Sequence, residues 1–250
     1  MQPIITLKNI SKTFLEKTHH PLTVVRDINL EIFPSEFFIF LGPSGCGKST
    51  LLRLMSGLEK EYRGTIAFDR GIGQQHTSFV FQQFALLPWL TVAENIGLGL
   101  TARHVASSTW IQRVHQELKR FHLERFAHAY PRELSGGMRQ RTGIARALAT
   151  DPKIIFMDEP FSELDSFTAQ ELRQELLDIW EEQKPTIVMV THNIQEALEL
   201  GDRIAVITAR PGTVAKIIEN TLPRPRQKRS EKFFTLEDHI ASMITHSEMK

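Results

Sequence analysis

The chain has 250 residues, of which 41% are hydrophobic and 24% are charged, and its formal net charge is +1. This composition is ordinary for a soluble globular protein, and the charge gives no general attraction to nucleic acid or to anionic membranes. Because there is one cysteine, no signal-peptide pattern and no apolar run near the roughly 18 residues of a membrane helix, we expect a cytoplasmic, non-spanning protein.

The first half of the chain is expected to be rich in β-strands. Alternating apolar and polar residues are typical of a half-buried strand, and a continuous apolar run is typical of a fully buried one. The polar stretch 15–21 is expected to be a loop, and residues 51–55 have helical character. The strands expected here are residues 4–10, 22–32, 37–41, 64–68 and 78–81.

The second half begins with helices and then alternates strands with helices. Thr91 and Glu94 form a capping box, and helical spacing at residues 107–129 makes residues 91–150 mostly helical. Thr168 and Glu171 predict a second capping box, which opens a helix to about residue 183. Strands are expected at residues 154–157, 186–190, 204–207 and 213–219. Such alternation predicts a largely parallel sheet.

The C-terminal end has a different composition. Residues 224–229 are basic and are interrupted by proline, and we interpret them as a solvated linker before a last helix near residues 235–247. No internal repeat or low-complexity tract is present.

A glycine-rich loop between the strand at 37–41 and the following helix carries the first chemical signal. Its sequence fits G-x-x-x-x-G-K-[ST], whose glycines let backbone N–H groups turn toward an anion at a helix N-terminus. Lys48 is predicted to reach the β- and γ-phosphates of a nucleotide, and the Ser49 hydroxyl to bind Mg²⁺. The nucleotide-contacting residues predicted here are Gly42, Pro43, Ser44, Gly45, Cys46, Gly47, Lys48, Ser49 and Thr50.

Two carboxylates follow the apolar strand at 154–157. Charged groups at the C-terminal edge of a parallel strand lie where such sheets bind ligands. Asp158 is therefore predicted to hold Mg²⁺, and Glu159 to polarise a water molecule aimed at the γ-phosphate.

Ser135 precedes two glycines and is predicted to cap a helix from about residue 137 to 149. The exposed N–H groups of Gly136 and Gly137 make this helix start a second anion site. One helix end cannot easily share a nucleotide with a phosphate loop in the same domain, so a second subunit is expected to bring it there.

In this order, these motifs resemble those of the ATP-binding subunits of ABC transporters, from about residue 4 to 220. Residues 42–50 resemble the Walker A motif, 134–140 the family signature, and 154–159 Walker B. The resemblance also implies roles for Gln82 as a Q-loop contact to Mg²⁺ and water, for His192 as a γ-phosphate contact, and for Phe14 as an adenine-stacking ring. Residues 162–165 resemble the D-loop that crosses the dimer interface.

The resemblance implies an α/β fold of the P-loop NTPase type. We expect a mixed core sheet, an N-terminal antiparallel β subdomain, and an inserted helical subdomain at about residues 91–150. The ATPase domain would span residues 1–222, followed by a basic linker and helix at 223–250. Implied ligands are ATP and Mg²⁺, and the implied assembly is a homodimer.

A narrower resemblance points to the nitrate, sulfonate and taurine importers. It is carried by residues 81–95, 136–141, 158–161 and 210–212. It implies transmembrane permease subunits, a separate solute-binding protein, no nucleic-acid partner, and a peripheral position on the cytoplasmic face of the inner or plasma membrane. The permease contact would involve Leu86, Leu87, Trp89 and Leu90, and the alternative is that these side chains fill a local core.

Three positions depart from the family pattern. Met138 replaces a glutamine of the signature, and Glu163 stands where a small D-loop residue is common. Ser35 replaces a glycine, which predicts a turn without positive φ.

The competing function is a soluble ABC ATPase acting on nucleic acid or ribosomes. DNA-repair members carry a long coiled-coil insertion between Walker A and the signature, and translation-factor members carry two cassettes. Residues 49–134 are too few for that insertion, and the chain has one cassette, so transport is favoured.

Overall fold

The structure is a computed structural model that describes residues 2–15, 20–69 and 71–248. The chain forms two compact units. Unit one comprises residues 1–75 and 184–250, and unit two comprises residues 76–183. No helix in the described ranges has the length and apolar character needed to cross a bilayer.

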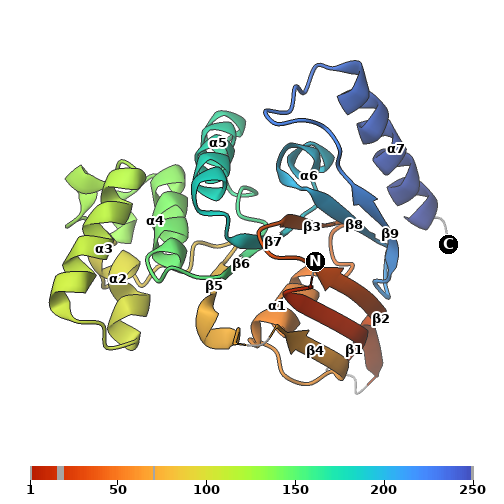
Figure 1. Cartoon of the computed structure of the whole chain (residues 1–250), viewed down its shortest axis with the longest axis horizontal. Coiled ribbons are helices and arrows are strands. Elements are labelled where there is room, and N and C mark those ends of the chain that lie inside the picture. Colours follow the sequence, from red (N-terminus) through yellow and green to blue (C-terminus); the bar gives the residue numbers. More distant parts are fainter. Residues whose placement is uncertain (1, 16–19, 70, 249–250) are drawn as a thin grey trace. The chain divides into compact units, whose positions relative to one another are not determined.

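Unit one contains a three-stranded antiparallel sheet in the order β2-β1-β4 (Figure 1). Its strands are β1 (Ile5–Leu15), β2 (Pro21–Ile32) and β4 (Arg63–Phe68). The register of β1 shifts between Leu7 and Ile10, where Asn9 has a φ of 54°. This bulge changes the alternation, so Ile10 and Lys12 continue the buried face that Ile5 and Leu7 begin. The predicted loop at 15–21 falls largely on residues outside the described part.

A second sheet in unit one has the order β7-β3-β8-β9. β3 is parallel to β7 and β8, whereas β9 is antiparallel to β8, which makes the sheet mixed. Every residue of β3 and β7 is buried, as expected for parallel strands covered on both faces. The strands are β3 (Phe37–Leu41), β7 (Thr186–Thr191), β8 (Arg203–Ile207) and β9 (Val214–Glu219).

Three helices of unit one pack around these strands. α1 (Lys48–Ser56) contacts β2 and β7, and α6 (Ile194–Leu200) contacts β3 and β7. α7 (Glu231–Glu248) packs on α6 and β8, and its Phe233 and Ile240 side chains are fully buried.

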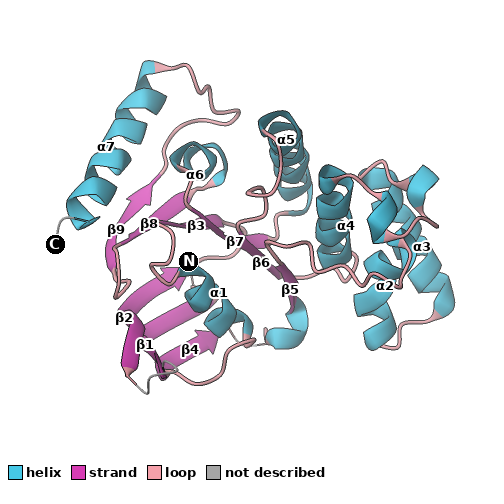
Figure 2. Cartoon of the chain, turned by 180° about the vertical axis from the view of Figure 1, so that it is seen from behind, coloured by secondary structure: helices cyan, strands magenta, loops and turns pink. Residues whose placement is uncertain are grey.

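Unit two pairs β5 (Thr77–Val80) with β6 (Ile154–Asp158) in parallel, and its other elements are mainly helical (Figure 2). The helices are α2 (Val92–Ala102), α3 (Ser107–Arg120), α4 (Gly136–Leu148) and α5 (Ser166–Gln183), with 3₁₀ turns at Glu124–Phe126 and Pro131–Glu133. A further 3₁₀ turn, Gln74–His76, spans the boundary between the units in the sequence. α2 packs on α3 and α4. The capping box of Thr91 and Glu94 is confirmed, with both reciprocal hydrogen bonds present.

Two helix predictions in unit two were wrong in detail. The helix expected at 107–129 ends at Arg120, and His122 has a left-handed φ of 56° that ends the helical path. Thr168 does not cap α5, which begins at Ser166. Oδ1 of Asp165 accepts hydrogen bonds from the N–H groups of Phe167 (3.1 Å) and Thr168 (3.0 Å), so the aspartate caps the helix one turn earlier.

The prediction for Ser35 was also wrong, because its φ is 61°. Its N–H donates to Oγ1 of Thr186 at 3.0 Å, a contact between distant parts of unit one that holds the turn. A serine therefore occupies a conformation that glycine adopts without strain.

The basic C-terminal segment is anchored rather than solvated. Arg226 has a side chain that is 2% exposed and donates to the carbonyl of Glu199 at 3.0 Å. Arg224 donates to the carbonyl of Leu200 and pairs with Asp202 at 2.8 Å. These carbonyls end α6, and a helix C-terminus attracts cations. The last helix accordingly starts at Glu231, earlier than predicted.

Candidate functional site

The phosphate loop of unit one joins β3 to α1. Gly47 has a φ of 102°, and a Cβ there would lie 2.7 Å from Cγ1 of Val25, so only glycine fits. No side chain caps the N-terminus of α1. Its first N–H groups can therefore be bonded by an anion, as the sequence predicts.

Lys48 lies within this loop and is 4% exposed. Its Nζ donates to the carbonyl oxygens of Gly42 and Pro43, both at 2.8 Å, and lies 3.9 Å from Sγ of Cys46. A buried ammonium needs such acceptors, so the loop is organised around its lysine. Burial raises the pKa of the Cys46 thiol above its ordinary value despite the opposing charge of Lys48, which keeps this thiol protonated at neutral pH.

His192 and the phosphate loop follow the C-terminal ends of neighbouring strands in the same sheet. β3 and β7 pair Leu41 with Thr191, so Gly42 and His192 each follow the end of neighbouring parallel strands. Thr191 donates its hydroxyl to Oε2 of Glu196 at 2.7 Å. The structure thus brings exposed His192 to the edge where such sheets bind ligands.

Phe14 is half-buried on β1. Nζ of Lys12 lies 4.5 Å from its ring centroid, and Lys12 also pairs with Glu59 at 2.9 Å. The ring therefore already attracts a cation on the sheet face that it shares with Lys12. Adenine stacking on Phe14 stays a prediction.

The acidic pair and Gln82 belong to unit two. β5 and β6 pair Val80 with Met157, so Gln82 and Asp158 lie near the same ends of two parallel strands. Asp158 is 2% exposed, whereas Glu159 is half-buried and has a left-handed φ of 44°. Such a backbone conformation costs about 1 kcal/mol or more for a residue with a Cβ. Strained residues of this kind cluster at functional sites, which agrees with the role predicted for Glu159.

The predicted signature residues form the start of α4. Oγ of Ser135 accepts a hydrogen bond from the N–H of Met138 at 3.2 Å, so Ser135 caps the helix. A Cβ on Gly137 would lie 2.6 Å from Cγ2 of Thr168, and one on Gly136 would lie 3.8 Å from Cδ2 of Leu164. The two glycines therefore allow residues around 164–168 to pack closely against the helix start.

The segment with the proposed permease contact is held by a buried asparagine. Asn95 is 0% exposed and bonds the backbone of Leu87, Leu90 and Thr91. Trp89 is 69% exposed, which argues against a place in a local core, while Leu86, Leu87 and Leu90 are half-buried. The segment thus presents a large apolar side chain from a fixed backbone.

The predicted magnesium ligands are a hydroxyl, an amide and a carboxylate, which are hard oxygen ligands suited to this ion. They are Ser49 of unit one and Gln82 and Asp158 of unit two. Among the described residues, no group of three or more His, Cys, Asp or Glu side chains could hold a metal. The magnesium site therefore stays a prediction.

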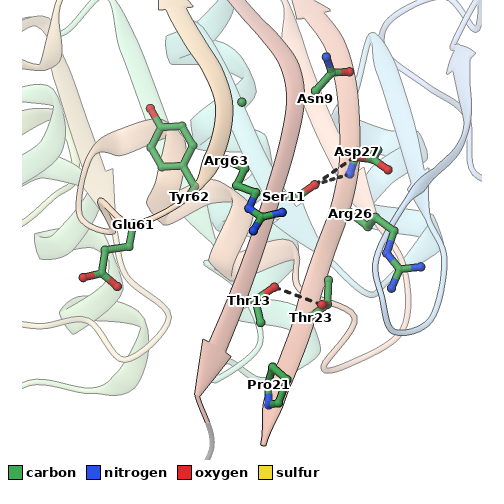
Figure 3. A pocket seen from close by; sticks show the side chains of 11 residues that line it. Asn9, Ser11, Thr13, Pro21, Thr23, Arg26, Asp27, Glu61, Tyr62 and Arg63 are labelled. Atoms are coloured by element: carbon green, nitrogen blue, oxygen red, sulfur yellow. Dashed lines mark hydrogen bonds between the residues drawn. The ribbon is translucent and has the colours of Figure 1, made fainter.

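The structure also has a cavity of about 890 Å³ on the outer face of the antiparallel sheet in unit one (Figure 3). Most of its lining residues carry polar side chains: Ser11 accepts a hydrogen bond from the N–H of Asp27 at 2.9 Å, and Thr13 is bonded to Thr23 at 3.1 Å. None of the predicted nucleotide residues lines it. It is therefore separate from the candidate site.

Sequence reasoning missed three residues that hold the predicted segments. Asn95 and Arg146 fix unit-two loops, since Arg146 donates to the carbonyls of Phe84 (3.0 Å) and Ala85 (2.6 Å). Arg210 donates to the carbonyl of Gly45 at 2.6 Å. A polar Asn95 on an apolar helix face was a usable signal, but nothing local indicates the acceptors of the two arginines.

Comparisons with known proteins agree with this geometry. The model of the family described as "ABC transporter" matches residues 25–162. An aliphatic sulfonates import ATP-binding protein of Bacillus cereus is 43% identical over 92% of this chain and 91% of its own length. A nitrate import ATP-binding protein of Synechococcus elongatus is 40% identical over 88% of this chain and 82% of its own. A dimeric, post-hydrolysis structure of an ATP-binding cassette bound to ADP and Pi has a TM-score of 0.76 and 36% identity, covering 86% of this chain and 98% of that one.

Proposed function

The chain belongs to the ABC transporter family of ATP-hydrolysing subunits, and we propose that it drives uptake of a small solute through separate membrane subunits. The match to the family model and the similarity to a solved ATP-binding cassette confirm the predicted family, ATPase class and P-loop fold. The observation that carries the import function is the near full-length match to sulfonate and nitrate import ATP-binding proteins. These relatives favour a small anion as the solute.

The phosphate loop would bind ATP through the N–H groups at the start of α1. Lys48 would exchange its carbonyl acceptors, Gly42 and Pro43, for phosphate oxygens. Ser49, Gln82 and Asp158 would hold Mg²⁺, which when bound neutralises phosphate charge. Glu159 would accept a proton from the water that attacks the γ-phosphorus, while the bridging oxygen leaves with ADP. His192 would contact the γ-phosphate, and Phe14 the adenine.

Two copies would enclose two ATP molecules, each contacted by the phosphate loop of one copy and by Ser135–Gly137 of the other. The solved relative is a dimer with ADP and Pi, which supports this arrangement. ATP would favour the closed dimer because its phosphates attract positive groups of both copies, and hydrolysis would reopen it. The cycle would act on the permease from the cytoplasmic face of the membrane, with a separate solute-binding protein delivering the cargo.

Replacement of Glu159 by Gln tests the hydrolysis mechanism. ATP hydrolysis should fall by about 100-fold or more, because a general base contributes roughly that much, while MgATP-dependent dimers persist in gel filtration. Glu181→Gln on the exposed face of α5 is the control for loss of a carboxylate and should hydrolyse ATP normally. Native turnover by Glu159→Gln would remove Glu159 from the mechanism.

Replacement of Trp89 by Ala tests the transport function. The variant should bind and hydrolyse ATP as the native protein does but lose co-purification with permease subunits, because a large exposed apolar contact is removed. Ile111→Ala, at a side chain that is 64% exposed on α3, is the control and should retain the partner. Co-purification with ribosomes instead of membrane proteins would favour the competing function.

A further inference from the structure

The hairpin of β8 and β9 lies directly against the phosphate loop within unit one. A Cβ on Gly42 would lie 2.5 Å from the carbonyl oxygen of Ile207, and a Cβ on Gly212 would clash with the carbonyl oxygen of Cys46. The tip of the hairpin is itself fixed to β2, because the N–H of Gly212 donates to the carbonyl of Val24 at 2.8 Å. The β8–β9 hairpin therefore packs closely against the phosphate loop and supports it.

Arg210, between β8 and β9, adds a charged hydrogen bond from the hairpin to the phosphate loop. Its Nε donates to the carbonyl oxygen of Gly45 at 2.6 Å, and its Nη2 would lie 3.4 Å from a Cβ on Gly45. Gly45 has a φ of 75°, so its backbone conformation is one that glycine favours. None of the ion pairs among the described residues involves Arg210, whose guanidinium is bonded to this backbone carbonyl.

The planarity of the peptide bond gives this contact a consequence for anion binding. The amide that carries the Gly45 carbonyl also carries the N–H of Cys46, and in a trans peptide these two groups point in opposite directions. The carbonyl points to Arg210, so the N–H points toward the interior of the loop, where its acceptor is the Pro43 carbonyl at 3.4 Å. That bond is long and can be replaced by a phosphate oxygen.

We propose that Arg210 is a positioning residue for nucleotide binding. By holding the Gly45 carbonyl, it keeps the Cys46 N–H available to phosphate and prevents the carbonyl from presenting its negative end to the nucleotide. Its charge also adds to the positive potential of the loop. This role concerns the ATPase itself and does not depend on which solute is transported or on the permease.

The test compares Arg210→Gln and Arg210→Lys with the native chain. Arg210→Gln should bind MgATP roughly ten-fold more weakly, the effect of losing one charged hydrogen bond. The KM for ATP should rise by a similar factor, while kcat stays within about two-fold, because the residue acts on binding. Arg210→Lys, which keeps a cation able to donate, should recover part of the affinity.

Thr208→Val is the matched control. Thr208 accepts a hydrogen bond from the N–H of Thr213 at 3.0 Å, so this variant loosens the same hairpin without removing the contact to Gly45. Hydrogen exchange gives a second measurement, since the amides of residues 45–48 should exchange faster in Arg210→Gln but not in Thr208→Val. Melting of each protein without nucleotide reports any general loss of stability.

The proposal is overturned by any of three results. The first is native MgATP affinity in Arg210→Gln with unchanged exchange of the loop amides. The second is an equal loss of affinity in Thr208→Val, which would make the effect one of hairpin stability. The third is a fall in kcat at constant KM, which would indicate a direct role in the transition state. If Arg210→Gln does not fold, the same criteria apply to Arg210→Lys.

Discussion

Replacement of Asn95 by Ala should destabilise unit two and release residues 86–90. The N–H of Leu87 donates to Oδ1 of Asn95 at 2.8 Å, and Nδ2 of Asn95 donates to the carbonyl of Leu90 at 3.0 Å. Nδ2 also bonds the carbonyls of Leu87 and Thr91, but each of these accepts a second backbone hydrogen bond. Two backbone groups would therefore lose the one partner that the structure gives them.

Each unsatisfied backbone group costs about 1–1.5 kcal/mol where water reaches part of the site, so the free energy of unfolding should fall by about 2–3 kcal/mol. Urea denaturation measures this change. Hydrogen exchange followed by mass spectrometry should show faster exchange at residues 86–90, because the backbone there loses its central anchor.

Asn220→Ala is the matched control in unit one. Asn220 is 9% exposed, and its Nδ2 donates to the carbonyls of Leu198 (2.9 Å) and Gly201 (3.0 Å). This variant should lose comparable stability and leave exchange at residues 86–90 unchanged. A change in stability below about 0.5 kcal/mol in Asn95→Ala, or equal acceleration of exchange in both variants, would refute the reasoning.

Two further predictions concern buried charges. Burial raises the pKa of the Glu117 carboxyl above 4.5 despite its pairing with Arg120. The folded state therefore binds the carboxyl proton more tightly than the unfolded state does. As a result, the free energy of unfolding of the native chain falls as pH rises through the raised pKa. Glu117→Gln lacks this loss, and its urea midpoint relative to the native chain should increase from about pH 4 to pH 7; a constant difference would contradict the prediction. Arg226→Ala removes the buried bonds to the carbonyls of Glu199 and Leu222, should cost about 2 kcal/mol, and should expose residues 227–231 to proteolysis; Lys232→Ala on α7 is the control that should remain resistant.

Features encoded in consecutive residues were predictable from the sequence. The phosphate loop, the capping box of Thr91 and the cap at Ser135 each depend on the spacing of a few neighbouring side chains. The strands of both sheets were also recognisable, because burial on one or two faces sets their apolar pattern.

Features that depend on distant parts of the chain were not predictable. The positive φ of Ser35 is held by Thr186, and the burial of Arg226 depends on the nearby end of α6. The basic run was interpreted from its composition, but composition does not show that helix carbonyls lie within reach. The cap of α5 was a different error, because Asp165 and Thr168 both fit a cap and the local pattern does not choose between them.

The phosphate loop shows how a local motif and a distant residue share one task. Its glycines and Lys48 are recorded in the motif, and Lys48 bonds the carbonyls of Gly42 and Pro43. The carbonyl of Gly45 is instead bonded by Arg210, which is far away in the sequence. When ATP binds, Lys48 would turn from its carbonyls to the phosphates, whereas Arg210 would still hold the Gly45 carbonyl away from the anionic ligand. The affinity of the loop for phosphate should therefore depend on where its carbonyls point as much as on its N–H groups, and only the first of these two cations is visible in the motif.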